Sequence, residues 1–438
     1  MKKEIVAILL FAFLLRGIVA YADNLEGWDE SVYASLGWQI KEGHNYAFEK
    51  FDDRNFDFGN SAGFRAPLLP NIIALVYWIL GDGIIAVSLI MPIFGTLGVY
   101  AAYLLGKELF DEKVGLYSAL FLTILPIHVI NSGLILTDVL VTTMLTFSVL
   151  FFQKGFIKNQ KYCKELCGFT TALAVLARYT ALFVLPVYLI IWLWKGKPKL
   201  KLELISTIII VLITLSPWLA YSYEEYGTPL GALIHSEKAP GYCCGEQLWY
   251  YFFLASPIMF GFFSLAFAYV LIRFDKRDLL LWLWIIVIFF FINSIPHKEM
   301  RYVLPFIPAL VILTAKELKE NKKMVVFLVA TSLILLFAQV KFLWKDHPCF
   351  FKSVEFLKQT EENAVLITWP SPRYYFYTHR EAHFPETNLI DQIKNYEKGY
   401  IVWLWDDEFY DDERPELNKL EKVFSCVEND KKIEVFSK

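Results

Sequence analysis

Long apolar runs recur along almost the whole chain. Nine of them carry few charges, and most have the ~17 to 25 residues that cross a bilayer. They lie near residues 4–22, 84–105, 114–132, 138–153, 203–221, 249–273, 279–295, 302–315 and 324–343. Another run, 166–194, is too long for one span and contains Arg178–Tyr179 near its middle, so we expect two short helices that meet there. The pattern predicts an all-α polytopic membrane protein with about eleven transmembrane helices.

The segment 67–81 decides the predicted topology. It is apolar but short, and it begins with two prolines, which is typical of interfacial or re-entrant segments. If it does not cross the membrane, the basic connectors all fall on one side, which the positive-inside rule assigns to the cytoplasm. These connectors are Lys2–Lys3, Lys154 to Lys164, Lys195 to Lys201, Arg273 to Arg277 and Lys316 to Lys323. We therefore expect 67–81 to be a juxtamembrane helix on the outer face of a multi-pass cell-membrane protein, with a cytoplasmic N-terminus.

The first apolar run contains a charge, Arg16. Because a charge is costly inside a bilayer, we expect Arg16 to pair with an internal carboxylate. The run lacks a small-residue cleavage site before Glu26, so we expect a retained first helix rather than a signal peptide.

Two domains are expected. Residues 1–344 form a transmembrane module with a long first outer loop at 23–83, and residues 345–438 form a small extracytoplasmic α/β domain. The second segment alternates strand-like runs with a polar helical stretch near 351–362; the runs begin at Val365, Tyr400 and Lys432. Cys349 and Cys426 flank this domain and could pair if the compartment is oxidising, but the sequence leaves open whether they or Cys243–Cys244 form disulfides.

Composition agrees with the membrane assignment. Apolar residues make up 56% of the 438 residues and charged residues 20%, against roughly 25% charged in soluble domains. The net charge of −3 gives no field that attracts nucleic acid. Six cysteines are too few for a disulfide scaffold, and their spacing with histidine does not predict a zinc site.

The first outer loop contains adjacent carboxylates, Asp29 and Glu30. A carboxylate near the bilayer surface can accept a proton from an attacking hydroxyl. The alternative is that Asp29 or Ser31 caps a surface helix that begins here. We give both interpretations equal weight.

Asp138 lies at the start of an otherwise apolar helix. Taken alone, the commoner interpretation is a helix N-cap. A single aspartate is also not a D-x-D metal motif, so the evidence for a divalent ion is weak.

The densest charge cluster at a membrane boundary runs from His297 to Tyr302 and includes Lys298, Glu299 and Arg301. Its cations suit a phosphate, because arginine provides bidentate contacts. The alternative is a solvated loop in which Glu299 neutralises its neighbours. Arg65 and Arg178, taken singly, are typical of interfacial anchors for lipid headgroups.

These elements together resemble a known family. The pattern comprises Trp28-Asp29-Glu30-x-x-Tyr33, Arg65-x-Pro67-x-x-Pro70, Leu136-Thr137-Asp138, Ala177-Arg178-Tyr179-Thr180, Ser216-Pro217-Trp218, Tyr226-Gly227-Thr228-Pro229 and His297-Lys298-Glu299-x-Arg301-Tyr302-x-x-Pro305-x-x-Pro308. Over about residues 1–315 it resembles a prokaryotic GT-C glycosyltransferase, in particular the dolichyl-phosphate-mannose–protein mannosyltransferase and aminoarabinose transferase branch. The C-terminal segment matches only loosely.

The resemblance implies a GT-C fold and transfer of a sugar, with inversion, from a polyprenyl-phosphate carrier to an acceptor hydroxyl on the outer face. It implies Asp29 or Glu30 as the base, and basic residues at Arg65 and in the late loop as ligands of the lipid phosphate. In related bacterial enzymes the position before the first proline is usually lysine, whereas here Ala66 separates Arg65 from Pro67. The expected catalytic residues are Asp29, Glu30 and Asp138, and the expected donor-binding residues are Arg65, Arg178, Tyr179, His297, Lys298, Glu299, Arg301 and Tyr302.

The expected donor is a monophosphate-linked monosaccharide, because the second outer loop supplies one aspartate rather than the pair that suits a pyrophosphate and its metal. No cofactor is expected, although a divalent metal stays open. The expected partners are the polyprenyl-phosphate-sugar donor, membrane lipids and an acceptor protein, glycan or lipid, without nucleic acid. Two alternatives are a polyprenyl-lipid flippase or transporter, for which the sequence has no convincing internal repeat, and a non-catalytic lipid-binding membrane subunit.

Overall fold

The computed structural model describes residues 3–23, 25, 27–48, 50–51, 62–81, 83–195, 202–238, 250–251, 256–295, 298–343, 348–369, 371–385, 389–404, 417, 419–428 and 431–438. These residues form two compact units. The first contains Met1–Asp23, Gly63–Ile72 and Leu80–Leu343; the second contains Asn24–Ala62, Ile73–Ile79 and Trp344–Lys438. The boundary at 343 lies beside the one expected from the sequence. The grouping of residues 24–62 with the C-terminal segment was not expected.

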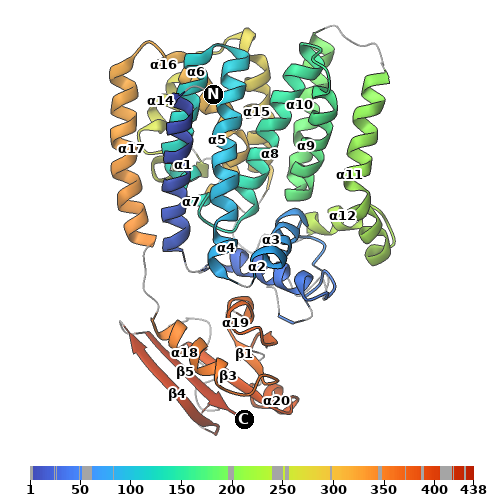
Figure 1. The fold of residues 1–438 in the computed structure, drawn as a ribbon, viewed down its shortest axis with the longest axis vertical. Coiled ribbons are helices and arrows are strands. Elements are labelled where there is room, and N and C mark those ends of the chain that lie inside the picture. Colours follow the sequence, from blue (N-terminus) through green and yellow to red (C-terminus); the bar gives the residue numbers. More distant parts are fainter. Residues whose placement is uncertain are drawn as a thin grey trace. The chain divides into compact units, whose positions relative to one another are not determined.

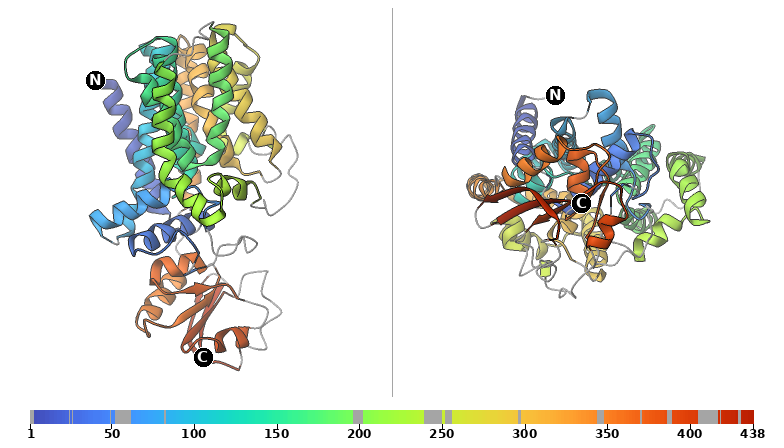
Figure 2. Two further views of the ribbon diagram at one scale, coloured as in Figure 1. Left: turned by 90° about the vertical axis from the view of Figure 1, so that its right-hand side faces the viewer. Right: turned by 90° about the horizontal axis from the view of Figure 1, so that it is seen from below.

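The first unit is a bundle of helices that run alongside one another (Figures 1 and 2). Its helices are α1 (Lys3–Ala22), α4 (Ile84–Ser88), α5 (Ile90–Leu109), α6 (Glu112–Ile124), α7 (Pro126–Asn131), α8 (Thr137–Phe152), α9 (Cys163–Ala177), α10 (Val184–Trp194), α11 (Leu202–Tyr226), α12 (Gly231–Lys238), α13 (Ser256–Phe260), α14 (Phe263–Leu271), α15 (Leu279–Ser294), α16 (Ile307–Leu318) and α17 (Lys322–Leu343). Short 3₁₀ turns, η3 (Tyr179–Phe183), η5 (Lys276–Asp278) and η6 (Met300–Phe306), precede α10, α15 and α16, and a π-helical turn, η2 (Gln153–Ile157), follows α8.

Most helices fall within the predicted apolar runs, but the run 114–132 forms two helices, α6 and α7, and the run 249–273 contains the two short helices α13 and α14. Six described helical segments are long and apolar enough to cross a membrane by themselves. The run 166–194 forms α9 and α10, which meet at Arg178 and η3, so the predicted pair of short helices is confirmed. The run 67–81 forms one helix, α3 (Leu68–Leu80).

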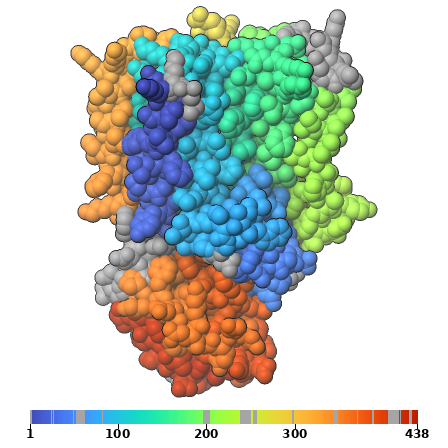
Figure 3. All heavy atoms as spheres, viewed as in Figure 1, coloured from blue at the N-terminus to red at the C-terminus, as the bar shows by residue number. Residues whose placement is uncertain are grey.

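Helix α8 is the central element of the bundle and α11 lies at its edge. Of the residues in the most apolar stretch of Thr137–Ile157, which is α8 with the turn η2, 67% are buried. In the corresponding stretch of α11 the share is 6%. Helix α8 packs on α5, α9 and η6, and the space-filling view shows α11 (light green) along one edge (Figure 3). Residues on α8 are therefore surrounded by protein, whereas α11 presents its apolar side chains outward.

Among the described residues, Arg16 is paired with backbone carbonyls and a histidine rather than with a carboxylate, contrary to the expectation. The guanidinium is fully buried and donates to the backbone carbonyls of Ala12, at 3.0 Å, and Leu122, at 3.0 Å, while its Nη2 lies 2.8 Å from Nδ1 of His128. Helix α6 ends just before Pro126, which has no N–H, so the last carbonyls of α6 lack helical donors. Arg16 supplies those donors.

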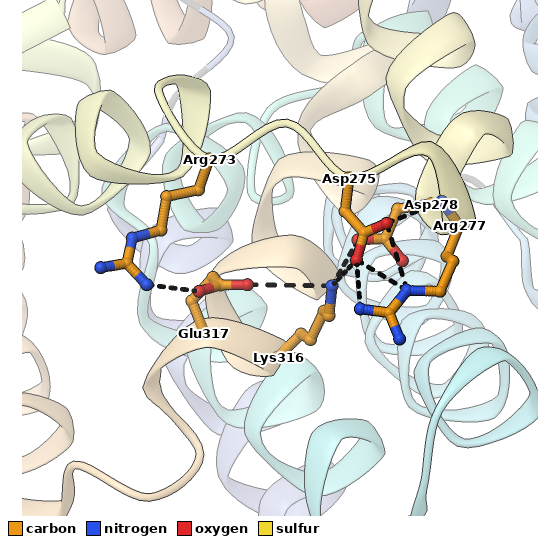
Figure 4. Close-up of polar contacts among 6 residues, drawn as sticks. All are labelled: Arg273, Asp275, Arg277, Asp278, Lys316 and Glu317. Carbon is orange, nitrogen blue, oxygen red and sulfur yellow. Dashed lines mark hydrogen bonds and ion pairs between the residues drawn. The ribbon is translucent and has the colours of Figure 1, made fainter.

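Two predicted basic connectors meet at one end of the bundle (Figure 4). Lys316 lies 2.5 Å from Asp278 and 3.6 Å from Asp275, and Arg277 pairs with Asp275 at 2.8 Å. Arg273 pairs with Glu317 at 3.6 Å. Residues 273–278 and the end of α16 thus lie on the same side of the bundle, as the topology requires; which side of the membrane this is stays a prediction.

The second unit combines a helix of the first outer loop with a five-stranded mixed sheet. The sheet has the order β2 (Ala382–His383), β1 (Val365–Thr368), β3 (Gly399–Leu404), β5 (Lys431–Ser437) and β4 (Glu421–Glu428). Strands β2, β1 and β3 are parallel, and β5 is antiparallel to both β3 and β4. The remaining elements are α2 (Trp28–Lys41), part of α3, α18 (Pro348–Lys358), α19 (Ser371–Thr378) and α20 (Leu389–Lys394). The predicted α/β character is confirmed.

Specific contacts join the first loop to this sheet. Ser35 of α2 donates to the carbonyl of Pro372 at 2.9 Å, and the ring of Trp28 stacks on that of Trp369. The backbone of Phe51 forms a parallel bridge with Ala382, beside β2. Cys349 and Cys426, whose pairing the sequence left open, form a disulfide between α18 and β4. Cys243 and Cys244 lie outside the described residues.

Candidate functional site

Asp138 and Arg178 form an ion pair at one end of the bundle. Asp138 lies in the first turn of α8, and Arg178 is the residue that ends α9, with an extended backbone. Because α8 and α9 are connected antiparallel neighbours, the start of one and the end of the other meet. Arg178 Nη1 contacts Asp138 Oδ1. Each charge also suits its helix end, since helix N-termini favour anions and C-termini favour cations.

The N-cap interpretation of Asp138 is therefore wrong. The cap position of α8 is Leu136, without a side-chain cap bond, and the Asp138 carboxylate contacts Arg178 instead. The carboxylate is only 2% exposed. A buried carboxylate is stable in the charged form only with a cation beside it.

A second arginine reaches the same carboxylate. Nε of Arg301, from η6, lies 3.7 Å from Asp138 Oδ2 and 2.7 Å from Glu299 Oε2. Arg301 Nη2 donates to Glu299 Oε1 at 2.8 Å, so this pair combines one hydrogen bond with an ionic contact at Nε. The Tyr302 hydroxyl donates to Glu299 at 3.3 Å, and its ring lies 4.7 Å below the Arg178 guanidinium.

These four charged residues, Asp138, Arg178, Glu299 and Arg301, form what we call the arginine–carboxylate cluster. It contains two cations and two anions, so it is formally neutral without a ligand. Residues of three separate predicted motifs meet here. Glu299 also pairs with Arg301, so it neutralises a neighbouring cation as the alternative interpretation of this loop predicted.

An apolar cavity of about 30 Å³ adjoins the cluster. Its polar wall is formed by Asp138, Arg178 and Tyr302. The rest is mainly aliphatic and aromatic, with Val141 and Leu145 of α8 and Ile288, Phe291 and Ile292 of α15. The cavity thus pairs charged groups with an apolar surface.

Tyr179, next to Arg178, holds the segment that carries Arg65 in place. Its hydroxyl donates to the carbonyl of Gly63 at 2.8 Å and accepts from Nε1 of Trp218 at 3.0 Å. Gly63 precedes Arg65 by two residues, so the segment that carries Arg65 is held against the α9–α10 junction. The half-buried Arg65 guanidinium lies over the Phe64 ring at 5.4 Å.

The two candidate bases of the first loop have different surroundings. Glu30 is buried, at 4% exposure, and its carboxylate accepts from the backbone N–H of Gly27 at 3.1 Å, which caps the start of α2. Ser31 donates to the carbonyl of Leu25. Asp29 is half-buried in the first turn of α2. The capping role predicted for this loop therefore belongs to Glu30.

Lys298 and His297 are the remaining candidates of the late loop. Lys298 is buried and donates to the carbonyl of Ile295, at 2.8 Å, just beyond the end of α15. Its ammonium is thus used as a C-terminal helix cap. His297 lies outside the described residues.

Tyr251 is a neighbour of the cluster that sequence reasoning missed. It is buried and within electrostatic range of Tyr302, Glu299 and Arg178. Its only sequence signal is a place near the start of an apolar run. Among the described residues, no group of three or more His, Cys, Asp or Glu side chains is arranged to hold a metal ion.

Comparisons with known proteins agree with this architecture. The family model of dolichyl-phosphate-mannose-protein mannosyltransferase matches residues 64–221, and that of the Alg9-like mannosyltransferase family matches residues 240–370. An uncharacterised protein of Aquifex aeolicus is 24% identical over 310 residues. That match covers 67% of this chain and 62% of the relative.

Solved structures show the fold. ArnT from Cupriavidus metallidurans bound to undecaprenyl phosphate has a TM-score of 0.77 at 14% identity, over 99% of this chain and 97% of that chain. The oligosaccharyltransferase AglB from Archaeoglobus fulgidus, in complex with an inhibitory peptide and a dolichol-phosphate, has a TM-score of 0.63 at 14% identity, over 92% and 69%. The predicted GT-C fold with a small C-terminal sheet domain is confirmed. The chain thus has the fold of ArnT and AglB, and two parts of it are similar to mannosyltransferase family models.

Proposed function

We propose that the protein transfers a single sugar from a polyprenyl monophosphate to an acceptor hydroxyl on the extracytoplasmic face, with inversion. The observation that carries this proposal is the arginine–carboxylate cluster beside an apolar cavity. A lipid phosphate presents the same combination, an anion joined to a hydrocarbon chain. Two structural neighbours are complexes with such lipids, ArnT with undecaprenyl phosphate and AglB with a dolichol-phosphate, and the proposal extends that chemistry to this chain.

Arg178 and Arg301 are the proposed ligands of the donor phosphate. Arginine binds phosphate with two parallel hydrogen bonds, and its charge is retained at any working pH. In the free protein both arginines are held by carboxylates, Asp138 and Glu299. Since Glu299 is the more exposed carboxylate, at 33% against 2%, we propose that Glu299 gives way to the phosphate while Asp138 keeps Arg178 in place.

The reaction requires two things of the protein. The acceptor oxygen attacks the anomeric carbon, and the bond from that carbon to the phosphate oxygen breaks, with its electrons leaving on the polyprenyl phosphate. The two guanidinium groups stabilise that departing charge. The acceptor proton goes to a carboxylate, for which Asp29 is our candidate because Glu30 is already engaged as a helix cap.

The test is transfer from radiolabelled polyprenyl-phosphate hexoses by purified protein, with and without EDTA. We expect wild-type protein to release the label from the lipid. We expect the same of the control Arg277→Gln, which removes the exposed ion pair of Arg277 with Asp275 at the other end of the bundle. We expect Arg178→Lys and Arg301→Lys to lower turnover at least about tenfold, since lysine keeps the charge but loses the bidentate contact. Asp29→Asn should abolish turnover.

Binding measurements separate the alternatives. Donor lipid that binds but never loses its label would favour a flippase or a non-catalytic lipid-binding subunit. Equal turnover in wild type and in both lysine variants would contradict the phosphate role of the cluster. Loss of turnover on chelation would show that a divalent metal takes part.

A further inference from the structure

The apolar cavity beside the arginine–carboxylate cluster is too small for the lipid of the proposed donor. Its volume is about 30 Å³, which is roughly the ~30 Å³ that one water molecule takes up in the liquid. A polyprenyl chain contains many carbon atoms, so most of it must lie elsewhere. A lipid phosphate can bind at the cluster only if its chain leaves the cavity between two helices of the bundle.

The inner walls of the cavity offer no path for such a chain. Val141 and Leu145 belong to α8, which packs on α5, α9 and η6 and is the most deeply buried of the described candidate spans. Tyr302 and Pro305 belong to η6, which packs on α8, α15 and α16. A chain directed toward either element would enter the protein core.

The outer wall is built differently. Phe291 of α15 lines the cavity, and its ring stacks on that of Phe183 at the end of η3, with centroids 3.5 Å apart. Both side chains are half-buried. Since Phe183 is not one of the residues that line the cavity, its accessible part faces away from the cavity. A pair of stacked rings therefore separates the cavity from the outside of the bundle at this point.

The surface on both sides of the ring pair is apolar. Helix α10 follows Phe183 and exposes Leu185 and Leu189, and α15 exposes Ile286 and Phe290. In each helix the two exposed residues are four apart and so share a face. Helices α10 and α15 pack on each other. We call the line where these helices meet, with the Phe183–Phe291 pair, the α10–α15 seam.

We infer that the hydrocarbon chain of the donor leaves the cavity through the α10–α15 seam, and that its first isoprene units contact Phe183 and Phe291. The inference rests on the proposed function, because it requires a phosphate held at the arginine–carboxylate cluster. It adds the path of the lipid chain, which the cluster alone does not define.

Stacked rings suit this role. When a hydrocarbon chain takes the place of one ring on the face of the other, one apolar contact replaces another and no hydrogen bond is lost. Each phenylalanine ring also moves by rotation about two side-chain dihedral angles. The seam can therefore open through side-chain rotation, and it closes the cavity when no chain is bound.

The experiment is photocrosslinking on the full-length protein in detergent. The probe is farnesyl phosphate with a diazirine on its first isoprene unit, and the adducts are located by mass spectrometry with and without an excess of undecaprenyl phosphate. Transfer of radiolabelled sugar is measured in the same preparation. We expect the adducts that undecaprenyl phosphate suppresses to lie on Phe183, on Phe291 or on neighbouring residues of α10 and α15.

Binding to variants tests the same path. Phe183→Asn and Phe291→Asn each place an amide against the chain, where it finds no hydrogen-bond partner, so each should raise the Kd of farnesyl phosphate at least about tenfold. Phe327→Asn is the matched control, because Phe327 forms an aromatic pair with Phe262 elsewhere in the bundle, with centroids 5.2 Å apart. It should bind farnesyl phosphate like wild type. Methyl phosphate, a headgroup without a chain, should compete with the probe equally in all four proteins.

Three results would overturn the inference while label transfer by wild type continues to support the proposed function. They are suppressible adducts that lie only on helices other than α10 and α15, an unchanged Kd of farnesyl phosphate in both seam variants, and an equal weakening of methyl phosphate and farnesyl phosphate in those variants. The absence of both suppressible adducts and label transfer would contradict the proposed function together with the inference.

Discussion

Arg178, which ends α9, holds the buried carboxylate of Asp138 in the first turn of α8. Forty residues separate the two along the chain. The contact joins two antiparallel helices at one end of the bundle and fixes the polar wall of the apolar cavity. The pair therefore has two roles, to stabilise the junction of α8 with α9 and to present a cation to a ligand.

The ion pair predicts a strong coupling between its partners. Arg178→Gln removes the nearer guanidinium from the carboxylate of Asp138, which is 2% exposed, while the Arg301 guanidinium lies 3.7 Å away. We expect a loss of about 3–5 kcal/mol in the free energy of unfolding, as for other buried pairs that lose one partner. Asp138→Asn with Arg178→Gln should cost less than the sum of the single variants, because the uncompensated charge is gone. Equilibrium unfolding in detergent measures all three.

The exposed pair of Arg277 with Asp275 is the control for this cycle. It lies in a connector, and the Arg277 side chain is 88% exposed. Surface pairs of this kind contribute about 0–1 kcal/mol, so Arg277→Gln should change unfolding little. Additive costs of Asp138→Asn and Arg178→Gln would show that the two side chains are not coupled in the folded protein.

Close packing at Gly63 gives a second prediction. A methyl group at Gly63 would lie 2.8 Å from Cε2 of Tyr226, closer than two carbons can approach. Gly63→Ala should therefore displace the segment that carries Arg65 and destabilise the protein by about 1–3 kcal/mol, as for other overpacked sites. We expect Tyr226→Leu to restore part of the loss in the double variant. Gly17→Ala on α1, where nothing lies within 4 Å of the added methyl, should not destabilise the protein in the same thermal unfolding assay, because alanine favours a helix over glycine.

Hydropathy was sufficient to predict the helices, because the need to cross a bilayer imposes a length and a composition that can be read locally. The break at Arg178 was predicted for the same reason, as a charge within an apolar run. The partner of Arg16 was not predictable. It depends on carbonyls of α6 that Pro126 leaves unsatisfied more than 100 residues away, and a charge in one helix carries no information about such groups in another.

The candidate site was predicted residue by residue but not as an arrangement. Asp138, Arg178 and Arg301 each stood out as charges at helix ends. Taken alone, however, Asp138 was more typical of an N-cap and Arg178 of a headgroup anchor, and Arg301 was compatible with a solvated loop. Only tertiary packing brings the three together. The union of residues 24–62 with the C-terminal segment was missed because it rests on contacts such as Ser35 with Pro372, whose polar atoms have no periodicity.

The disulfide between Cys349 and Cys426 gives a third prediction, on the stability of the second unit. The two residues are 77 apart in sequence. In the chain-entropy account, a crosslink that closes a loop of this length lowers the entropy of the unfolded chain and so stabilises the fold by about 4 kcal/mol. Cys349→Ser with Cys426→Ser should therefore lower the Tm of this unit, and dithiothreitol should lower the Tm of wild type but not of the double variant. An unchanged Tm after complete reduction would show that the crosslink does not stabilise the fold.

The fourth prediction concerns pH and rests on Glu381. Hydrogen bonding to His383, at 3.0 Å, and pairing with Lys50 hold the pKa of this carboxyl below its usual range. A carboxyl with a lowered pKa stabilises the folded state above its unfolded pKa of about 4.3, and this stabilisation is lost as the pH falls through the folded value. Glu381→Gln should therefore lower the Tm at pH 7, with a difference from wild type that shrinks from about pH 4 downward. Asp391→Asn, on the exposed pair with Lys394 at 3.0 Å, is the matched control and should run parallel to wild type. A Tm difference that stays constant from pH 7 to pH 3 would contradict the role of the Glu381 charge, because a purely steric effect of the substitution does not depend on protonation.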